Sequence, residues 1–311
     1  MSALTNALGD YLKLRRSLGH KLAEAERQLA KFVVYLDLVG VETVTMETAL
    51  AFVLDPDIDP STTLSSRRLS AVRGFARYLA GSDPRTEIPP SGLVSYRAQR
   101  RTPFLFTEAD IVALIAAART TTPHRLRAAT LETLIGLLAV TGMRVGEAIR
   151  LDQADIDWDD AVLAVRATKF NKSRNVPVAP GTIDALAAYA GLRASAGSGA
   201  AGTTRFFVSL AGTPLVYTNF CFTFNQAVGI AGIGVGSPIK PRIHDLRHRF
   251  ATLTLTRWCR DGLDIDMLMP RLSTYLGHLE PRYTYWYLSA TPELLGHAAA
   301  RLEAHRQTVT S

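Results

Sequence analysis

Residues 244–252 have the sequence HDLRHRFAT, and this stretch is the most informative one in the chain for both fold and chemistry. A helix that begins near Pro241 places His244 and Arg247 three residues apart, and therefore on one face. The opposite face carries apolar side chains, namely Leu246, Phe250 and Leu253. The stretch therefore predicts a helix with one face in a core and the other face at a site.

Three further stretches carry reactive side chains in a fixed order along the chain. TGMRVGE spans residues 141–147, TKFNK spans 168–172, and LGH at 276–278 is followed nine residues later by Tyr287. Together with residues 244–252 they supply the groups needed to break a DNA backbone without metal or nucleotide. Any one stretch alone would be weak evidence for this chemistry, but all four in this order are hard to obtain by chance.

The two arginines of these stretches suit the charge of a phosphodiester. Its transition state spreads additional negative charge over the non-bridging oxygens, and fixed cations stabilise that charge. Arginine forks onto two oxygens and stays protonated. Arg144 follows Thr141 and Gly142, where a helix must end and the chain must turn, so we expect it to project into a cleft.

The leaving group and the nucleophile need two other residue types. A deoxyribose 5′-hydroxyl cannot leave as an alkoxide near neutral pH, so it must receive a proton, and a lysine at a hairpin tip can supply one. A tyrosine ester to phosphate conserves the bond energy for a later attack by a DNA hydroxyl. Three tyrosines are candidates for this role, namely Tyr283, Tyr285 and Tyr287.

The order of these residues resembles the active site of a tyrosine recombinase, the family of phage integrases and Xer-type resolvases, over roughly residues 104–300. The resemblance implies that Arg144 and Arg247 clamp the phosphate, that Glu147 holds the site together, and that His244 and His278 hydrogen-bond the phosphate. It also selects Tyr287 as the nucleophile, because the family places it nine residues after the histidine. The chemistry it implies is a 3′-phosphotyrosyl intermediate with no cofactor and no metal.

The identity of the proton donor stays open between two lysines. Lys169 aligns with the general acid of the family, which commonly lies between glycines, whereas this chain has Thr168 and Phe170 there. That departure makes Lys172 a competitor for the same role.

Length and charge are consistent with a two-domain protein that binds a polyanion. The chain has 311 residues, enough for two domains, and 35 Lys and Arg against 28 Asp and Glu give a net charge of +7. We expect a helical core-binding domain at 1–96, a basic linker at 97–106, and a catalytic domain at 107–311. Six arginines are candidate DNA contacts, although a solvated face explains those in the first domain equally well: Arg67, Arg68, Arg73, Arg97, Arg100 and Arg101.

The periodicity of apolar residues predicts a mainly α fold with one small antiparallel β-sheet. In the first domain we expect a helical pair over 8–38 broken near Gly19, a helix at 45–54, and a helix capped by Ser61 or Thr62 that ends near Leu79. A later helix is expected to be capped at Thr107, and further helices are expected at 126–140, 147–151, 181–193 and 218–230. A β-hairpin is expected from 161–167 and 175–178. The two cysteines, Cys221 and Cys259, are expected to be reduced.

The expected partners are double-stranded recombination sites, a homotetramer on paired sites, and accessory proteins. The sequence lacks a membrane-spanning or signal segment, so a cytoplasmic, nucleoid-associated protein is expected. The segment around Tyr287 resembles recombinases of mobile elements more than chromosome-dimer resolvases. The alternatives are a type IB topoisomerase, which reseals the same strand, and an inactive DNA-binding accessory protein on the same scaffold.

The tail after Tyr287 is predicted to form an exchange helix. Thr291 caps it and Pro292 lies in its first turn. An apolar stripe follows at helical spacing, consisting of Leu294, Leu295, Ala298 and Leu302. The stripe either packs on its own domain or inserts into a neighbouring protomer, as the resembling family does.

Overall fold

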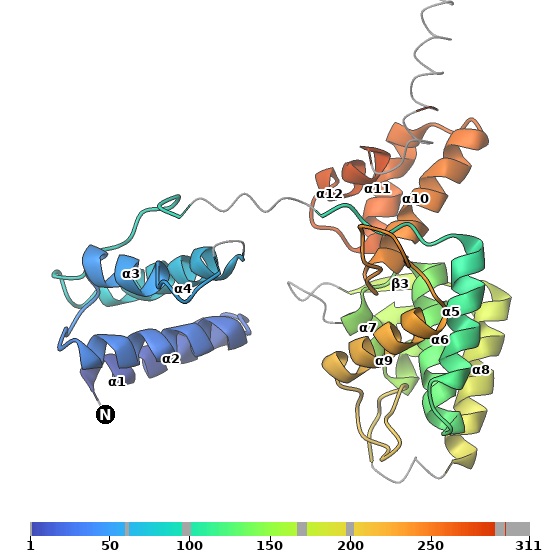
Figure 1. Ribbon diagram of the computed structural model, residues 1–311, viewed down its shortest axis with the longest axis horizontal. Coiled ribbons are helices and arrows are strands. Elements are labelled where there is room, and N and C mark those ends of the chain that lie inside the picture. Colours follow the sequence, from blue (N-terminus) through green and yellow to red (C-terminus); the bar gives the residue numbers. More distant parts are fainter. Residues whose placement is uncertain are drawn as a thin grey trace, which may run out of the picture. The chain divides into compact units, whose positions relative to one another are not determined.

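The structure is a computed structural model that describes residues 2–59, 62–94, 101–166, 173–196, 202–289 and 296. The chain forms two compact units, Met1–Arg100 and Arg101–Ser311. The prediction of a mainly helical fold with a small antiparallel sheet is confirmed (Figure 1).

All the regular secondary structure in the described part of the first unit is helical. Its helices are α1 (Ala3–Ser17), α2 (Ala23–Leu38), α3 (Met46–Val53) and α4 (Leu64–Leu79). Phe32, Leu36 and Phe75 are completely buried between them, so large apolar side chains from α2 and α4 form the core. The predicted break between the first two helices is confirmed, because Gly19 has a φ of +84° there. Helix α4 begins slightly later than expected, with Thr63 as its N-cap residue.

The second unit is built around one long apolar helix. This helix, α6 (Arg125–Thr141), packs beside α5 (Glu108–Thr120) and α8 (Pro180–Ser195), as Figure 1 shows. The predicted start of α5 is confirmed, because Thr107 and Asp110 form a reciprocal capping box. The other described helices of the unit are α7 (Val145–Ile149), η1 (Gln153–Asp155), α9 (Tyr217–Ile230), α10 (Asp245–Arg260), α11 (Ile265–Leu276), α12 (Arg282–Tyr285) and η4 (Trp286–Ser289).

A small antiparallel sheet in the order β1-β2-β3 lies in the same unit. Its strands are β1 (Ile156–Asp157), β2 (Val162–Val165) and β3 (Arg174–Pro177). The hairpin of β2 and β3 was predicted, whereas β1 was not, because two residues are too few to show an alternating pattern. Val165 pairs with Arg174 at the end of the ladder, where the segment that contains Lys169 joins the two strands.

A second apolar cluster in this unit joins α10, α11 and η4. Leu255 and Met269 are completely buried in it, and Tyr287 packs against the same cluster. Leu246 is also completely buried, as its predicted apolar face requires, but Leu253 on that face is 48% exposed. The apolar face of α10 is therefore shorter than the sequence pattern indicated.

Two further features concern possible membrane spans and the cysteines. Among the residues that the structure describes, no helix is both long enough and apolar enough to span a bilayer. Cys221 and Cys259 are both half-buried and are not joined in a disulfide.

Candidate active site

The end of α6 places Arg144 at the site. The helix ends at Thr141, and Gly142 follows in the left-handed region with a φ of +60°. A Cβ at Gly142 would lie 2.5 Å from the ring of Phe250, so both the backbone conformation and the packing require glycine. The predicted turn is confirmed, and Arg144 becomes the N-cap residue of α7.

Arg247 of α10 is buried against the backbone of two other segments. It is 2% exposed, and it donates hydrogen bonds to the carbonyl oxygens of Gly142 (2.8 Å) and Leu276 (2.6 Å). Burial lowers the pKa of Arg247 to about 10, and the positive charge of Arg144 acts in the same direction. The guanidinium therefore stays protonated at neutral pH, with a fixed orientation.

Arg144 shares its bonds between a carboxylate and a carbonyl. One terminal nitrogen donates to Glu147 (2.8 Å) and the other donates to the carbonyl oxygen of Gly277 (2.8 Å). Its side chain is 36% exposed, whereas the side chain of Glu147 is 3% exposed. Part of the Arg144 guanidinium is therefore open to a ligand, while its carboxylate partner is enclosed.

Glu147 is ionised because two arginines surround it. Burial alone would raise the pKa of this carboxyl, but hydrogen bonds and positive charge from Arg174, and hydrogen bonds from Arg144, lower the pKa to about 2. Arg174 was not predicted as a site residue. It is the first residue of β3 and lies on the same inward face of the strand as Val176, which is completely buried. An arginine at an inward-facing strand position was the available sequence signal.

Three arginines converge on three successive carbonyl groups at the C-terminal end of α11. Arg174 donates to Tyr275 (2.7 Å), Arg247 donates to Leu276, and Arg144 donates to Gly277. The last carbonyl groups of a helix have no partner within the helix and carry partial negative charge. The end of α11 therefore holds these positive charges close together, and this is the arrangement that a phosphate group requires.

The two predicted histidines flank this cluster and favour their neutral forms. Burial, with positive charge from Arg247 and Arg144, lowers the pKa of His278 to about 3. Its Nδ1 lies 2.7 Å from the hydroxyl of Thr284, a buried residue that sequence reasoning missed. Loss of hydration among the surrounding protein atoms, together with the positive charge of Arg247, also lowers the pKa of His244. Because His244 is exposed at the start of α10, we expect that shift to be the smaller one.

Tyr287 differs from the other two candidate tyrosines in its surroundings. Tyr283 and Tyr285 are 39% and 40% exposed, whereas Tyr287 is 3% exposed. Its ring stacks on that of His278, with centroids 6.2 Å apart, and meets the edge of His248 at 5.4 Å. The ring of Tyr283 also lies near that of His278, with centroids 6.4 Å apart, but Tyr287, which the family spacing selects, is the only one of the three tyrosines that is enclosed.

Both candidate proton donors, Lys169 and Lys172, lie outside the described residues, as does the predicted exchange helix of the tail apart from Gly296. The described strands β2 and β3 flank this segment in the chain, and Arg174, the first residue of β3, contacts Glu147 beside the cluster at α11.

The candidate DNA contacts in the first unit have different surroundings from one another. Arg68 is buried and donates to the carbonyl oxygen of Phe52 (2.8 Å), and its guanidinium carbon lies 4.4 Å from the centroid of the Phe52 ring. Arg73 donates to the carbonyl oxygens of Pro89 (2.8 Å) and Pro90 (3.0 Å). These bonds occupy both guanidinium groups within the unit, so we leave both residues out of the proposed DNA-binding set.

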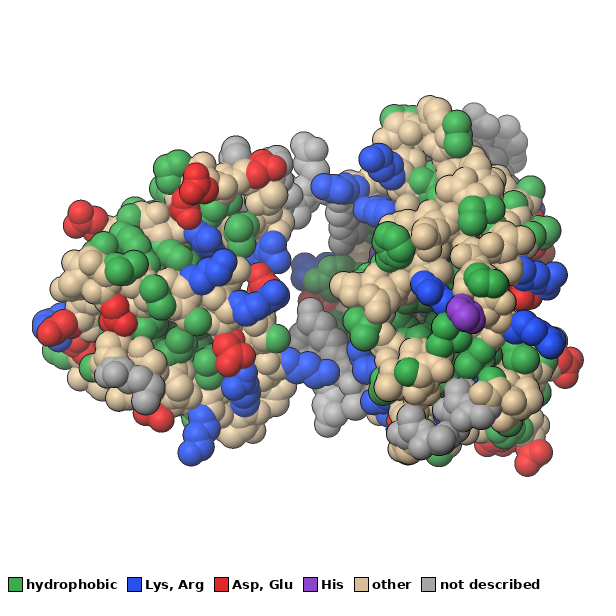
Figure 2. Space-filling model, turned by 60° about the horizontal axis from the view of Figure 1, so that its bottom comes forward, with side chains coloured by type: hydrophobic (Ala, Val, Ile, Leu, Met, Phe, Trp, Pro, Cys, Tyr) green, Lys and Arg blue, Asp and Glu red, His purple; other side chains and the backbone are tan. Residues whose placement is uncertain are grey.

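Arg67 and Arg101 are exposed, whereas Arg97 and Arg100 lie outside the described residues. Figure 2 shows Lys and Arg side chains on the visible face of each unit, between hydrophobic and uncharged side chains. Exposed arginines are therefore available for phosphate contacts, although this distribution does not single out one patch.

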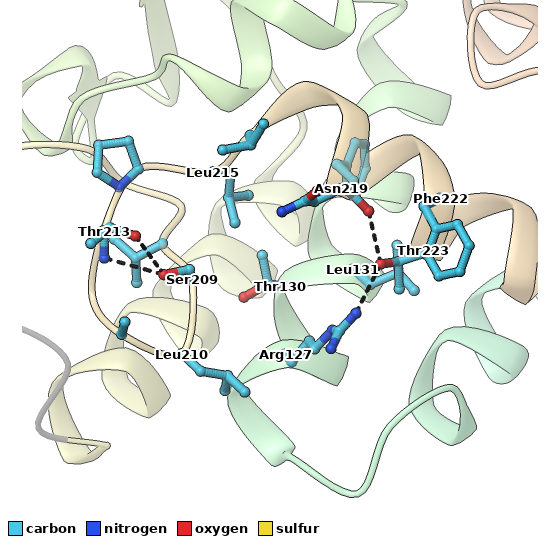
Figure 3. Close-up of a pocket in the computed structure, with 15 residues that line it drawn as sticks. Arg127, Thr130, Leu131, Ser209, Leu210, Thr213, Leu215, Asn219, Phe222 and Thr223 are labelled. Carbon is cyan, nitrogen blue, oxygen red and sulfur yellow. Dashed lines mark hydrogen bonds between the residues drawn. The ribbon is translucent and has the colours of Figure 1, made fainter.

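A cavity of about 590 Å³ lies elsewhere in the second unit, between α6, α9 and the loop before α9. Figure 3 shows that its polar groups bond one another: Arg127 donates to the hydroxyl of Thr223 (3.2 Å), which donates to the carbonyl oxygen of Asn219 (2.9 Å). Among the described residues, its lining is mostly apolar and contains one cation. The described lining therefore does not supply the several cations that a phosphodiester site requires.

Comparison with known proteins gives the same picture as this geometry. Residues 105–293 match the phage integrase family. A protein of Sinorhizobium fredii strain NGR234, described as integrase/recombinase y4rB, is 42% identical, and the match covers 97% of this chain and 98% of that protein.

Two solved structures have the same fold at low sequence identity. One is the Tn1549 transposon integrase in complex with transposon right end DNA, with 15% identity, a TM-score of 0.63, and coverage of 96% of this chain and 98% of that chain. The other is a lambda integrase tetramer bound to a Holliday junction, with 18% identity, a TM-score of 0.57, and coverage of 89% and 78%.

Proposed function

Because the chain belongs to the phage integrase family of tyrosine recombinases, we propose that it is a site-specific DNA recombinase of a mobile element. It cuts and rejoins DNA through a 3′-phosphotyrosyl intermediate, in the cytoplasm and at the nucleoid. The observation that carries the proposal is the convergence of Arg144 and Arg247 on the end of α11, beside His278 and the enclosed ring of Tyr287.

The first chemical step transfers the phosphate from DNA to the protein. The phenolic oxygen of Tyr287 gives its proton to His244 and attacks phosphorus. The bond from phosphorus to the 5′ oxygen breaks, and Lys169 gives that oxygen a proton. Lys172 is the alternative donor. Arg144 and Arg247 stabilise the charge that develops on the non-bridging oxygens, and His244 and His278 hydrogen-bond the same group.

The second step reverses the first with a different strand. The 5′-hydroxyl of the partner duplex gives its proton to the lysine and attacks the phosphotyrosine, so that a new phosphodiester forms. The tyrosine oxygen leaves and takes back its proton from His244. No bond is lost to hydrolysis, so no external energy source is required.

The proposed partners are paired recombination sites bound by four protomers, together with accessory proteins. The solved lambda integrase tetramer on a Holliday junction supports an assembly of this size for a protein of the same fold. The tail at 291–311 is proposed to insert into a neighbouring protomer. Deletion of this tail should leave single-site binding nearly intact and abolish complexes of paired sites in a gel.

A nicked suicide duplex separates the proposed function from its alternatives. The binding sequence is first selected from random-sequence DNA with Tyr287→Phe protein, which cannot form the adduct. The wild-type protein should then form a covalent complex on the nicked duplex and transfer a strand to a second duplex. A covalent complex that reseals only its own strand indicates a topoisomerase, and binding without any covalent complex indicates an accessory protein.

A further inference from the structure

Thr284 connects the ring of His278 to the segment that carries Tyr287. The hydroxyl oxygen of Thr284 lies 2.7 Å from Nδ1 of His278, and Thr284 is completely buried. It belongs to α12, and Tyr287 follows three residues later in η4. The ring of Tyr287 stacks on that of His278. The imidazole is therefore held at one edge by Thr284 and on one face by Tyr287.

The backbones of His278 and Thr284 are each fixed by an adjacent turn. The N–H of His278 donates to the carbonyl oxygen of Ser273 (2.9 Å), directly after the left-handed Gly277 that ends α11. The N–H of Thr284 donates to the carbonyl oxygen of Pro281 (2.7 Å). The contact between the ring and the hydroxyl is therefore set by ordered backbone on both sides.

The bond at Nδ1 decides which nitrogen of His278 carries the proton. Burial, with the positive charge of Arg247 and Arg144, lowers the pKa of His278 to about 3, so the ring is neutral at pH 7 and has a single N–H. Two arrangements satisfy the contact with Thr284. Either the hydroxyl donates to Nδ1 and the ring proton lies on Nε2, or Nδ1 donates to the hydroxyl oxygen and Nε2 is bare.

The surroundings of the hydroxyl favour the first arrangement. Among the residues that the structure describes, Nδ1 of His278 is the acceptor within reach of the Thr284 hydroxyl, and no second one is bonded to it. In the second arrangement the hydroxyl proton would therefore be buried without an acceptor, which is costly. With the proton on Nε2, His278 can donate to a phosphate oxygen, whereas a bare Nε2 can only accept.

We propose that Thr284 is a positioning residue that donates a hydrogen bond to Nδ1 of His278, and so keeps the ring proton on Nε2 as the donor to the phosphate. This role rests on the proposed function, since a phosphate oxygen is the group that the Nε2 proton would bind. Serine keeps the hydroxyl and can replace threonine, whereas valine keeps the branched shape and loses the donor.

The tautomer of His278 is measured directly by NMR in the full-length protein without DNA. Wild type, Thr284→Val and Thr284→Ser are prepared with ¹⁵N in their histidines, and the His278 signals are identified by their loss in His278→Ala. A protonated and a bare ring nitrogen differ in ¹⁵N shift. Wild type and Thr284→Ser should carry the proton on Nε2, whereas in Thr284→Val the ratio of the Nδ1–H to the Nε2–H form should rise by up to about 10-fold.

Two outcomes of this measurement overturn the inference. One is a proton on Nδ1 in wild-type protein, which needs no variant and therefore decides the question even if Thr284→Val does not fold. The other is a set of His278 ring signals in Thr284→Val that is identical to that of wild type.

The rate of covalent-complex formation on a nicked duplex gives the functional readout. Thr284→Val should be about 10-fold slower than wild type, which is the upper end of what one neutral hydrogen bond contributes, while its DNA affinity stays within about 3-fold. Thr284→Ser should react at close to the wild-type rate. His278→Ala should be slower still, by about 100-fold, because it removes a donor to the reacting phosphate.

A double variant separates positioning from general destabilisation. If Thr284 acts through His278, Thr284→Val should cost little further rate in a protein that already carries His278→Ala. A variant that was merely destabilised would lose the same factor in both backgrounds, and that result overturns the inference.

The matched control is Thr130→Val. Thr130 is also buried, and its hydroxyl bonds the carbonyl oxygen of Leu126 (2.7 Å) and the hydroxyl of Tyr189 (3.2 Å) instead of a site residue. Thr130→Val should leave the His278 tautomer and the rate unchanged. If wild-type protein forms no covalent complex, the proposed function fails, while the tautomer of His278 without DNA still decides separately whether Thr284 is the donor to Nδ1.

Discussion

The arginines at the end of α11 and the arginines of α4 have the same side chain in different settings. At α11, three guanidinium groups from separate segments converge on successive carbonyl groups, and two of them, those of Arg144 and Arg174, also bond one buried carboxylate. On α4, Arg67 is exposed, whereas Arg68 and Arg73 bond backbone carbonyls within their own unit. Arginine content therefore does not indicate a site by itself, whereas convergence of guanidinium groups from distant segments does.

The difference has a physical basis in what each guanidinium group can still bind. Arg68 stacks on Phe52 and bonds its carbonyl, so its contribution is to the stability of the first unit. At α11, the like charges are offset by the helix end and by Glu147, while the side chain of Arg144 stays 36% exposed and can bind a further anion. The cluster is therefore arranged for a ligand, and Arg68 is arranged for the fold.

The largest expected effect concerns the proton donor that completes the cluster. Lys169→Ala should slow formation of the covalent complex about 1000-fold, within the usual range for a general acid. A substrate with sulfur at the bridging 5′ position should restore the rate, because the leaving thiolate needs no proton. Chelator should change neither rate. If only Lys172→Ala shows this rescue, Lys172 is the donor.

The next effect concerns the carboxylate that the cluster encloses. The pKa of Glu147 in the folded protein is about 2, below its ordinary value of 4.5, so its ionised form stabilises the fold above about pH 4.5. That stabilisation is lost as pH falls toward 2 and amounts to about 3 kcal/mol. Denaturant unfolding of the full chain between pH 6 and 2 should show a loss for wild type that Glu147→Gln lacks. Parallel curves for the two proteins would contradict the enclosure of this carboxylate by two arginines.

The smallest effects test the α4 side of the comparison with two adjacent residues. Arg68→Ala should lower the free energy of unfolding by about 2 kcal/mol, because the Phe52 carbonyl and the ring lose their charged partner. Arg67→Ala should leave stability unchanged and weaken DNA binding a few-fold, with the salt dependence of affinity reduced by about one unit of slope. The reverse pattern, with Arg68→Ala affecting only DNA binding, would remove the distinction drawn between the two regions.

The motifs predicted much of the site because their spacing constrains both chain position and chemistry. The turn at Gly142 required a left-handed residue, and the resemblance to the family, which places its tyrosine nine residues after the histidine, selected the enclosed tyrosine among three. The assignment of catalytic roles to these residues stays a prediction. Arg174 was missed because a single arginine on a four-residue strand has no periodic signal, and its partners lie 27 and 101 residues away in the sequence.

The arginines of α4 were harder to interpret, although they do lie in a periodic helical pattern. A helical pattern separates apolar from polar faces, but it does not distinguish an arginine that faces solvent from one that bonds a carbonyl at the edge of the core. Arg68 is such a residue. The short strand β1 was missed because two residues carry no alternation, and the start of α4 was misplaced because the capping side chain was inferred from residue type alone.

The central claim is that Tyr287 becomes covalently attached to DNA, and the most direct measurement is the identity of the attached residue. The covalent complex formed on a nicked duplex is digested with trypsin and nuclease, and the modified peptide is fragmented in a mass spectrometer. We expect the nucleotide on Tyr287, loss of the complex in Tyr287→Phe, and its retention in Tyr283→Phe and Tyr285→Phe. A nucleotide on Tyr283 or Tyr285, or a complex that persists in Tyr287→Phe, would contradict the account.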